Sequence, residues 1–428
     1  MYSIKLSYLL LFLTIFLMVS CEEVQDAIEE PEDQASEIEQ QIGESYLSAD
    51  VLEFTIVELE GDRIFDELNN GEVTIPITNP SNELVDVTIP SQPAELLAEG
   101  VNRGIQRSGE SDNGQMEEVP LPSEQSFILG SPEQAGISAT GGLTILDDSQ
   151  SMVQGMVFHP DFGTSFMEPV NLVLQSDEYT GWHVIYNAEN TAELNIDEGL
   201  SSLEKERSPK NRDESDLTER ATFTSTEVVL DGDVEFYEWD ESTVWRRQRN
   251  NFLASRLLYQ LIEPNSSGGD WQLDTKIKGQ EVWVSGGPST TNPGDLRNEI
   301  SPTQPEGSGN EDYFLINPVD DDDLHVFFVG YAVDRFIGMA WIGNDDIGLG
   351  THSWNEAAGL HSLSFKMRIV AHEVGHNIGG VHGNAIKSGC SGSMCGRSVM
   401  NHVITPSTEY FFSDNNDDRI ETVLDVID

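Results

Sequence analysis

Residues 372–382 read His-Glu-Val-Gly-His-Asn-Ile-Gly-Gly-Val-His, and this stretch decides the fold class that we expect. Apolar residues at helical spacing lead into it and predict one buried face of a helix: Leu363, Met367, Val370, Ala371, Val374 and Ile378. Because His372 and His376 are four residues apart, their imidazoles project side by side from a neighbouring face of that helix. Two imidazoles one helical turn apart can hold one zinc ion.

Gly379 and His382 complete the predicted metal site. Gly379 permits a sharp turn out of the helix, often through a left-handed backbone conformation, and the chain then brings His382 back as a third ligand. Three neutral imidazoles leave the fourth zinc position open for water, as in a catalytic rather than a structural site. Glu373 follows the first ligand and is placed to take a proton from that water. The five fixed residues would fall in this pattern by chance with a probability on the order of 10⁻⁴ over the chain.

The extended pattern HExxHxxGxxH resembles that of the metzincin zinc peptidases. The resemblance implies that His372, His376 and His382 bind one zinc ion. It also implies that Glu373 is the general base and that Met400 forms the Met-turn, a hydrophobic base under the histidines that is not a ligand. A single Met ordinarily just packs in the hydrophobic core, so the assignment of Met400 to the Met-turn rests on its position after the motif.

Within the metzincins, the sequence is most similar to the reprolysin or adamalysin-like group. Gly-His-Asn at 375–377 and Tyr-Phe-Phe-Ser-Asp at 410–414 are typical of that group. Residues 337–343 look like its edge strand, on which a substrate peptide lies extended with main-chain hydrogen bonds, although a plain edge strand would read the same way. Gly383 departs from the group, which usually has Asp there; this bears on subgroup and local rigidity rather than on the metal site.

The segment 226–428 alternates strand and helix patterns. Strands are predicted at 227–230, 281–284, 324–329 and 337–342, and a helix at about 240–263, before Pro264. Strands that alternate with helices predict a mixed sheet with helical cover. The expected fold class is therefore α/β (α+β): a metzincin catalytic domain with a mixed twisted sheet and an active-site helix, preceded by a mostly β pro-domain.

The segment 51–200 predicts that β-rich domain. Short β-type runs are broken by Pro, Gly and Asn, and lie at 73–77, 84–89, 126–129, 143–146, 170–174 and 183–186. Residues 126–130 and 163–169, which close with Glu-Pro, look like the end of a reprolysin-type propeptide. The resemblance implies an inhibitory or chaperoning pro-domain, released at the charged linker 201–225. Latency by a cysteine thiolate on zinc is excluded, because no Cys lies between Cys21 and Cys390.

The segment 1–20 predicts export. Its apolar run from Tyr8 to Val19 is too short to span a bilayer as a helix but suits a signal peptide. Met-Val-Ser-Cys, ending at Cys21, resembles a bacterial lipobox, which implies a lipid on Cys21; a buried N-terminal helix or an uncleaved anchor is the alternative. The segment 21–50 is acidic, without Lys or Arg, and predicts an extended tether. We therefore expect a protein held by lipid in the cell envelope, at the outer membrane or the cell surface.

The charge balance excludes one class of partner. With 22 Lys and Arg against 76 Asp and Glu, the net charge is −54, which repels a phosphate backbone. Nucleic acid is therefore not an expected partner. The 38% of hydrophobic residues still suffices for a folded core.

Three lesser features leave alternatives open. Cys390 and Cys395 form a disulfide in an exported protein or remain free thiols. The acidic runs 320–323 and 415–418 offer the oxygen ligands of Ca²⁺, or are simply solvated. His352 lies near the motif in sequence, but lone histidines are more often structural.

These observations favour a membrane-tethered zinc endopeptidase that hydrolyses peptide bonds in proteins or peptides. The alternative is a surface binding protein or adhesin with a structural zinc site and no proteolysis, which a fourth protein ligand would favour. A third hypothesis is an immunity or inhibitor-like lipoprotein whose first half functions without the second.

Overall fold

The computed structural model describes residues 31–45, 47–107, 117–118, 126–130, 139–147, 152–176, 179–192, 194–195, 222–239, 244–257, 271–300, 323–331, 333, 338–343, 349, 352–356, 361–382, 399–400, 403–404 and 414–427. The predictions for the signal segment 1–20, for Cys21 and for the Cys390 and Cys395 pair lie outside these residues. So does most of the predicted linker 201–225.

The first sheet is antiparallel throughout and has eight strands in the order β1-β10-β9-β8-β7-β6-β3-β2. Its strands are β1 (Thr55–Glu58), β2 (Glu72–Thr78), β3 (Leu84–Pro93), β6 (Ser126–Leu129), β7 (Thr140–Asp147), β8 (Met152–His159), β9 (Gly163–Pro169) and β10 (Trp182–Asn187). Five of the six strand runs predicted in the segment 51–200 are confirmed by β2, β3, β6, β7 and β10.

The sixth run, 170–174, is wrong as a strand, because it forms the short helix α5 (Val170–Leu174). Val170 and Val173 are three residues apart and both buried, so one helical face carries the apolar contacts. Gln175 ends the helix with a left-handed backbone, at φ 53°. A short apolar run does not distinguish a strand from a helix by periodicity.

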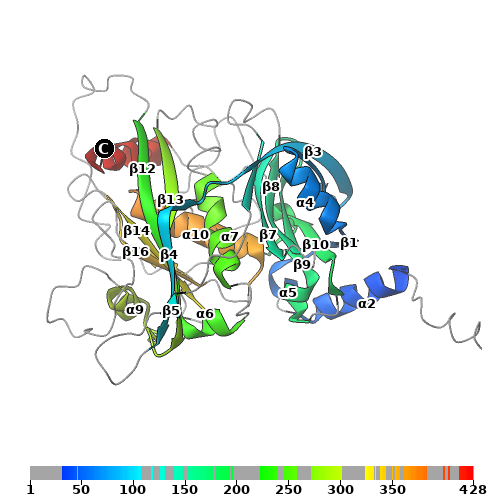
Figure 1. Cartoon of the computed structure of the whole chain (residues 1–428), viewed down its shortest axis with the longest axis horizontal. Helices are drawn as coiled ribbons and strands as arrows, with labels where there is room; N and C mark the ends of the chain where they lie inside the picture. The colour runs from blue at the N-terminus through cyan, green and yellow to red at the C-terminus, as the bar shows by residue number, and fades with distance from the viewer. Residues whose placement is uncertain are drawn as a thin grey trace, which may run out of the picture.

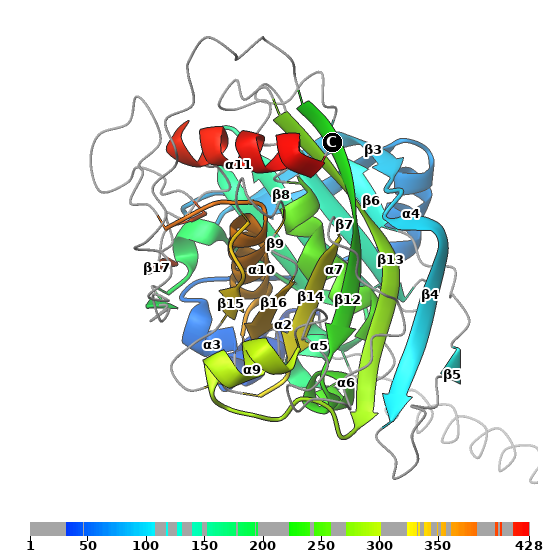
Figure 2. The same cartoon turned by 90° about the vertical axis from the view of Figure 1, so that its left-hand side faces the viewer.

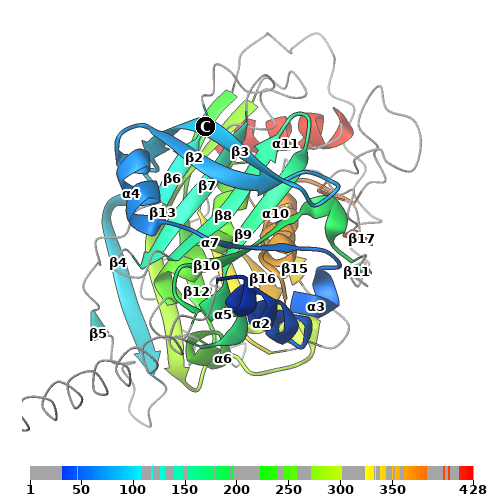
Figure 3. The same ribbon diagram turned by 90° about the vertical axis from the view of Figure 1, so that its right-hand side faces the viewer.

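The prediction of an extended tether over 21–50 is also wrong for its last part. Residues Pro31–Gly43 form helix α2 and Leu47–Asp50 form helix α3. Ile38 and Ile42, four residues apart, are fully buried and join the main hydrophobic cluster. Figure 3 shows α2 beside α5, beneath the first sheet. Burial of two isoleucines on one face outweighs the repulsion between the acidic side chains.

The second sheet is mixed, as predicted, and runs β15-β16-β14-β12-β13-β4-β5. Its strands are β4 (Leu97–Arg107), β5 (Glu117–Glu118), β12 (Thr222–Gly232), β13 (Trp271–Ser285), β14 (Leu324–Val329), β15 (Gly338–Ala340) and β16 (His352–Glu356). Five of these strands lie in the second half, and β4 and β5 come from the first half. Figure 2 shows β4 beside β13, to which it is parallel.

The helices of the second half are α6 (Val234–Trp239), α7 (Val244–Leu257), α9 (Pro293–Glu299), α10 (Leu363–Asn377) and α11 (Asp414–Ile427). The remaining short elements are α4 (Gly61–Asn69), η4 (Ala188–Asn190) and the strand pair β11 (Leu194–Asn195) and β17 (Val403–Ile404). Helices α7 and α10 lie between the two sheets and contact both (Figure 1). In the part of the chain that the structure describes, no helix is long and apolar enough to cross a membrane.

One hydrophobic cluster joins the two halves of the chain. It contains Phe166 of the first sheet, Leu230 of the second, and Met367 and Val370 of α10, all with no exposed surface. The two predicted domains therefore share a core, and the predicted boundary near residue 200 does not separate two independent sets of contacts.

Arg103 holds β4 in the second sheet through its side chain. It is 3% exposed, and its Nε and Nη2 both donate to Oε1 of Gln280 on β13, at 3.0 and 2.8 Å. Nε2 of Gln280 donates in turn to the main-chain oxygen of Trp245 on α7. The guanidinium also lies 5.7 Å from the ring centroid of Trp245.

We expect Arg103→Ala to lower the free energy of unfolding by about 1.5–3 kcal/mol, because it removes two charged hydrogen bonds and leaves a buried acceptor without them. Arg63→Ala is the matched control, since Arg63 makes its ion pairs with Glu60 and Glu67 at the surface, and it should lower that free energy by less than about 1 kcal/mol. Urea denaturation measures both. Equal losses in the two variants would contradict the role of Arg103.

Candidate metal centre

Helix α10 positions two of the three predicted metal ligands. Ser362 caps its N-terminus, with Oγ accepting from the Phe365 amide at 3.3 Å. The predicted apolar face is confirmed, because its members are fully buried: Leu363, Met367, Val370, Ala371, Val374 and Ile378. The polar residues of α10 are buried as well, so the helix has no solvent face.

The turn after α10 brings the third histidine back. Gly379 has a φ of 104°, which confirms the predicted left-handed turn. A Cβ on Gly379 would lie 2.7 Å from Cγ2 of Val423, so α11 packs directly against the turn. Asn416 of α11 accepts from the Val381 amide and donates to the Val381 oxygen, both at 3.0 Å. The sequence does not mark this role of Asn416, which lies in an acidic run that predicts at most a calcium site.

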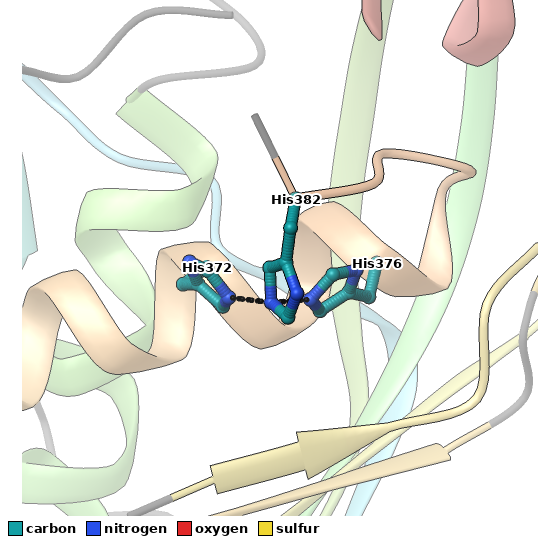
Figure 4. A group of neighbouring side chains, drawn as sticks. All are labelled: His372, His376 and His382. Carbon is teal, nitrogen blue, oxygen red and sulfur yellow. Dashed lines mark hydrogen bonds between the residues drawn. The ribbon is translucent and has the colours of Figure 1, made fainter. Parts of the chain in front are cut away.

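The three histidines converge, as Figure 4 shows. Nε2 of His382 lies 3.2 Å from Nε2 of His372 and 3.0 Å from Nε2 of His376. His372 and His376 come from successive turns of α10, and His382 approaches from the chain that follows it. His372 and His376 are almost fully buried, and His382 is partly exposed.

Main-chain oxygens fix the orientation of two rings. Nδ1 of His372 lies 2.7 Å from the Val399 oxygen, and Nδ1 of His376 lies 2.8 Å from the Gly380 oxygen. A carbonyl oxygen only accepts, so each Nδ1 carries the proton and donates. The Nε2 lone pairs of both rings are therefore left to face the shared point, as metal-binding histidines require.

The donor set fits zinc. Two zinc–nitrogen bonds of about 2.0–2.1 Å at a tetrahedral angle place their nitrogens about 3.4 Å apart. The two separations from Nε2 of His382 are close to this value, and the ligand atoms of all three histidines lie within 4.8 Å of one another. Imidazole nitrogens are suitable zinc ligands. Among the described residues, these three histidines form the group that could hold a metal, and no fourth His, Cys, Asp or Glu joins them. A fourth ligand, which would favour the structural-zinc alternative, is thus not found in this part of the chain.

Met400 lies beside Gly380, which is in the turn that precedes the third histidine. It has no exposed surface. A Cβ on Gly380 would lie 3.3 Å from its Cε, and the preceding residue, Val399, accepts from His372. The Val399–Met400 turn thus reaches both the ring of the first ligand and the turn before the third.

Glu373 is turned toward the edge of the second sheet. Its side chain is 1% exposed, and a Cβ added to Gly338 of β15 would lie 2.3 Å from its Oε1. The carboxylate therefore occupies the space that any larger residue at 338 would need. The sequence does not mark Gly338 as a residue that makes room for the predicted base.

The predicted edge strand is confirmed by β15, which ends the second sheet and pairs on one side with β16. Asn377 attaches this edge to α10, with Nδ2 donating to the Trp341 oxygen at 2.9 Å and to the His352 oxygen at 3.0 Å. The Gly343 amide donates to the His376 oxygen at 3.0 Å. In the sequence, Asn377 is only part of a pattern typical of the family; in the structure it joins the edge of the sheet to the ligand helix.

Two lesser predictions are now placed. His352 lies on β16, where its Nε2 is 3.1 Å from the Arg297 oxygen. Burial holds the pKa of His352 well below its usual value, and the nearby His325 and Arg297 lower it further. His352 is therefore a neutral, structural histidine. Residues 415–418 lie in helix α11 rather than in a loop. Calcium binding stays a prediction.

We expect His382→Ala to weaken zinc binding by at least about a hundredfold, since changes to groups that only orient a ligand already cost about 10–100-fold. Competition with a chromophoric chelator measures the affinity. His159→Ala is the control, because His159 stacks on Phe162 in the first half and lies outside the metal group. Unchanged zinc affinity in His382→Ala would contradict its assignment as a ligand.

Comparisons with known proteins bear on the second half of the chain. The model of the reprolysin-like metallopeptidases of family M12B matches residues 273–425. No curated protein matches the chain. A solved structure described as "Structure of a chaperone-substrate complex" is 16% identical with a TM-score of 0.31, and the match covers 46% of this chain and 30% of that chain. The matched family region contains the three histidines, Glu373, Met400 and the edge strand, and residues 273–425 therefore form a reprolysin-like metallopeptidase domain of the metzincin class.

Proposed function

We propose that the protein is a zinc-dependent endopeptidase that hydrolyses peptide bonds in proteins or peptides. The observation that carries the proposal is the convergence of three Nε2 atoms at 3.0 and 3.2 Å, within a region that matches a metallopeptidase family. Zinc bound there would polarise the scissile carbonyl and activate a water molecule.

The residues of this chain supply orientation and proton transfer. The Val399 and Gly380 oxygens keep the rings of His372 and His376 in the tautomer that binds metal. The Glu373 carboxylate, adjacent in sequence to the first ligand, takes the proton of the attacking water and passes it to the departing amine.

Strand β15 holds the substrate backbone. It ends the second sheet, so a peptide can add to it as a further strand with main-chain hydrogen bonds. Glu373 lies against Gly338 of this same strand, which sets the proposed base beside the bound peptide. Asn377 fixes the strand and the ligand helix to each other.

Replacement of Glu373 tests the proposal. We expect Glu373→Gln to retain zinc and to lose peptide hydrolysis by at least about a hundredfold, since an amide does not take the proton. Zinc content is measured by mass spectrometry, and cleavage by sequencing the products of a mixed peptide library with and without chelator. Glu58→Gln, at an exposed carboxylate at the end of β1, makes the same change away from the site and should retain full activity. Unchanged cleavage in Glu373→Gln would contradict the assignment of Glu373 as the general base.

We also propose that the chain is exported and held to a membrane through lipid on Cys21. Support comes from the apolar run and the lipobox-like Met-Val-Ser-Cys in the sequence. Cleavage of the chain at the linker 201–225 likewise stays a prediction.

Lipid labelling tests the anchor. In bacteria fed an alkyne fatty acid, we expect label on the wild-type chain, none on Cys21→Ser, and full label on the control Cys390→Ser. Label that persists on Cys21→Ser, or an unlabelled wild-type chain, would overturn the proposal.

A further inference from the structure

The N-terminus of α10 is built largely by the first half of the chain. A helix leaves its first four amides without partners inside the helix, and in a buried helix these amides have no water to bind. Those of α10 belong to Ser362, Leu363, Ser364 and Phe365. Only the last is satisfied locally, by the hydroxyl of Ser362.

The other three amides donate to side chains from the first half. Ser362 donates to Oδ2 of Asp50 at 2.7 Å. Leu363 donates to Oε1 of Glu168 at 2.8 Å, and Ser364 donates to the hydroxyl of Tyr186 at 3.1 Å. These acceptors come from α3, β9 and β10. Figure 1 shows β9 next to one end of α10, which it contacts.

The three acceptors are themselves fixed. Asp50, Glu168 and Tyr186 are 3%, 1% and 0% exposed. The Tyr186 hydroxyl donates to Oε1 of Glu168 at 2.7 Å while it accepts from Ser364, so one hydroxyl serves both halves. Negative side chains at a helix N-terminus are also favoured by the helix dipole.

A buried cation balances these carboxylates. Lys366, in the first turn of α10, is 8% exposed. Burial lowers the pKa of Lys366 to about 8, and Glu168 and Asp50 oppose that change while Arg247 adds to it. Burial raises the pKa of Glu168, which Lys366 opposes. Loss of the first half would remove the charges of Glu168 and Asp50 from the surroundings of Lys366.

We infer that Asp50, Glu168 and Tyr186 are positioning residues for the metal-binding helix, so that the two halves form one catalytic unit rather than a peptidase with a removable inhibitor. This deepens the proposed function and rests on it. Helix α10 is a rigid element that begins at Leu363 and carries His372 about 14 Å further on, at 1.5 Å per residue. A displacement of its first turn therefore moves the ligands, and misplacement by about 1 Å can reduce a rate a hundredfold.

The inference also bears on cleavage of the linker. If the chain is cut between residues 201 and 225, the first half must stay bound for the three amides to keep their acceptors. Pairing of β4 with β13 supplies a second reason for the halves to stay together.

Two variants of Glu168 in the full-length chain test this. Glu168→Ala removes the acceptor of the Leu363 amide, whereas Glu168→Gln keeps an acceptor oxygen. In Glu168→Ala we expect hydrogen exchange over 363–372 to accelerate at least about tenfold, and kcat to fall about tenfold or more with zinc retained. The visible absorption of the cobalt-substituted protein should shift in Glu168→Ala. All three readouts should return toward wild type in Glu168→Gln.

Glu67→Ala is the matched control. Glu67 is also a carboxylate of the first half, and it accepts hydrogen bonds from the main-chain amide of Thr74 and from the side chain of Arg63. It lies on α4, away from α10. It should leave exchange over 363–372 and the cobalt spectrum unchanged. If Glu168→Ala does not fold, Tyr186→Phe, which removes only the hydroxyl, should produce the same changes.

Wild-type exchange and an unshifted cobalt spectrum in Glu168→Ala, or equal effects in Glu67→Ala, would overturn the inference. These two readouts do not depend on activity. If the wild-type protein binds metal but cleaves no peptide, the proposed function is refuted. Hydrogen exchange and the cobalt spectrum still test the positioning role in that case.

Discussion

Complete burial of α10 is the constraint on which the metal centre depends. All fifteen of its residues are buried, so the main-chain groups that the helix leaves unpaired must find partners within the protein. The first half provides acceptors at one end, through Asp50, Glu168 and Tyr186. At the other end, Arg419 donates to the Gly379 oxygen and Asn416 holds Val381. The histidines are thus placed by contacts from both halves of the chain.

The same arrangement explains how a strongly acidic protein accommodates two of its buried carboxylates. Most carboxylates of a chain with a net charge of −54 can remain in water. Asp50 and Glu168 are exceptions, and both accept hydrogen bonds from amides at the N-terminus of the helix. Burying a charge is tolerable where hydrogen bonds and an opposite charge replace water, which Lys366 and the helix amides do here.

Local features of the site could be predicted from the sequence, and distant ones could not. The apolar face of α10, the turn at Gly379 and the edge strand follow from spacing, glycine chemistry and family resemblance, which act over a few residues. The run 170–174 was wrong as a strand because five apolar-rich residues fit either structure. The prediction of an extended tether was wrong over 31–50, because the many acidic residues of this segment conceal the two isoleucines whose burial stabilises the helix. No local pattern marks Asp50 as a partner of Ser362, 312 residues away, or Arg103 as a partner of Gln280.

Strand β4 has a consequence for the order of events during synthesis. Residues 97–107 leave the ribosome long before residues 271–285, with which they pair in the second sheet. Until then the nascent chain carries a strand with an unmatched edge, a template for wrong pairing with other chains. Completion of the sheet, and with it assembly of the metal centre, therefore waits for nearly the entire polypeptide. Contacts between residues so distant in sequence slow folding. Until they form, the incomplete chain has no metal centre with which to cleave other proteins.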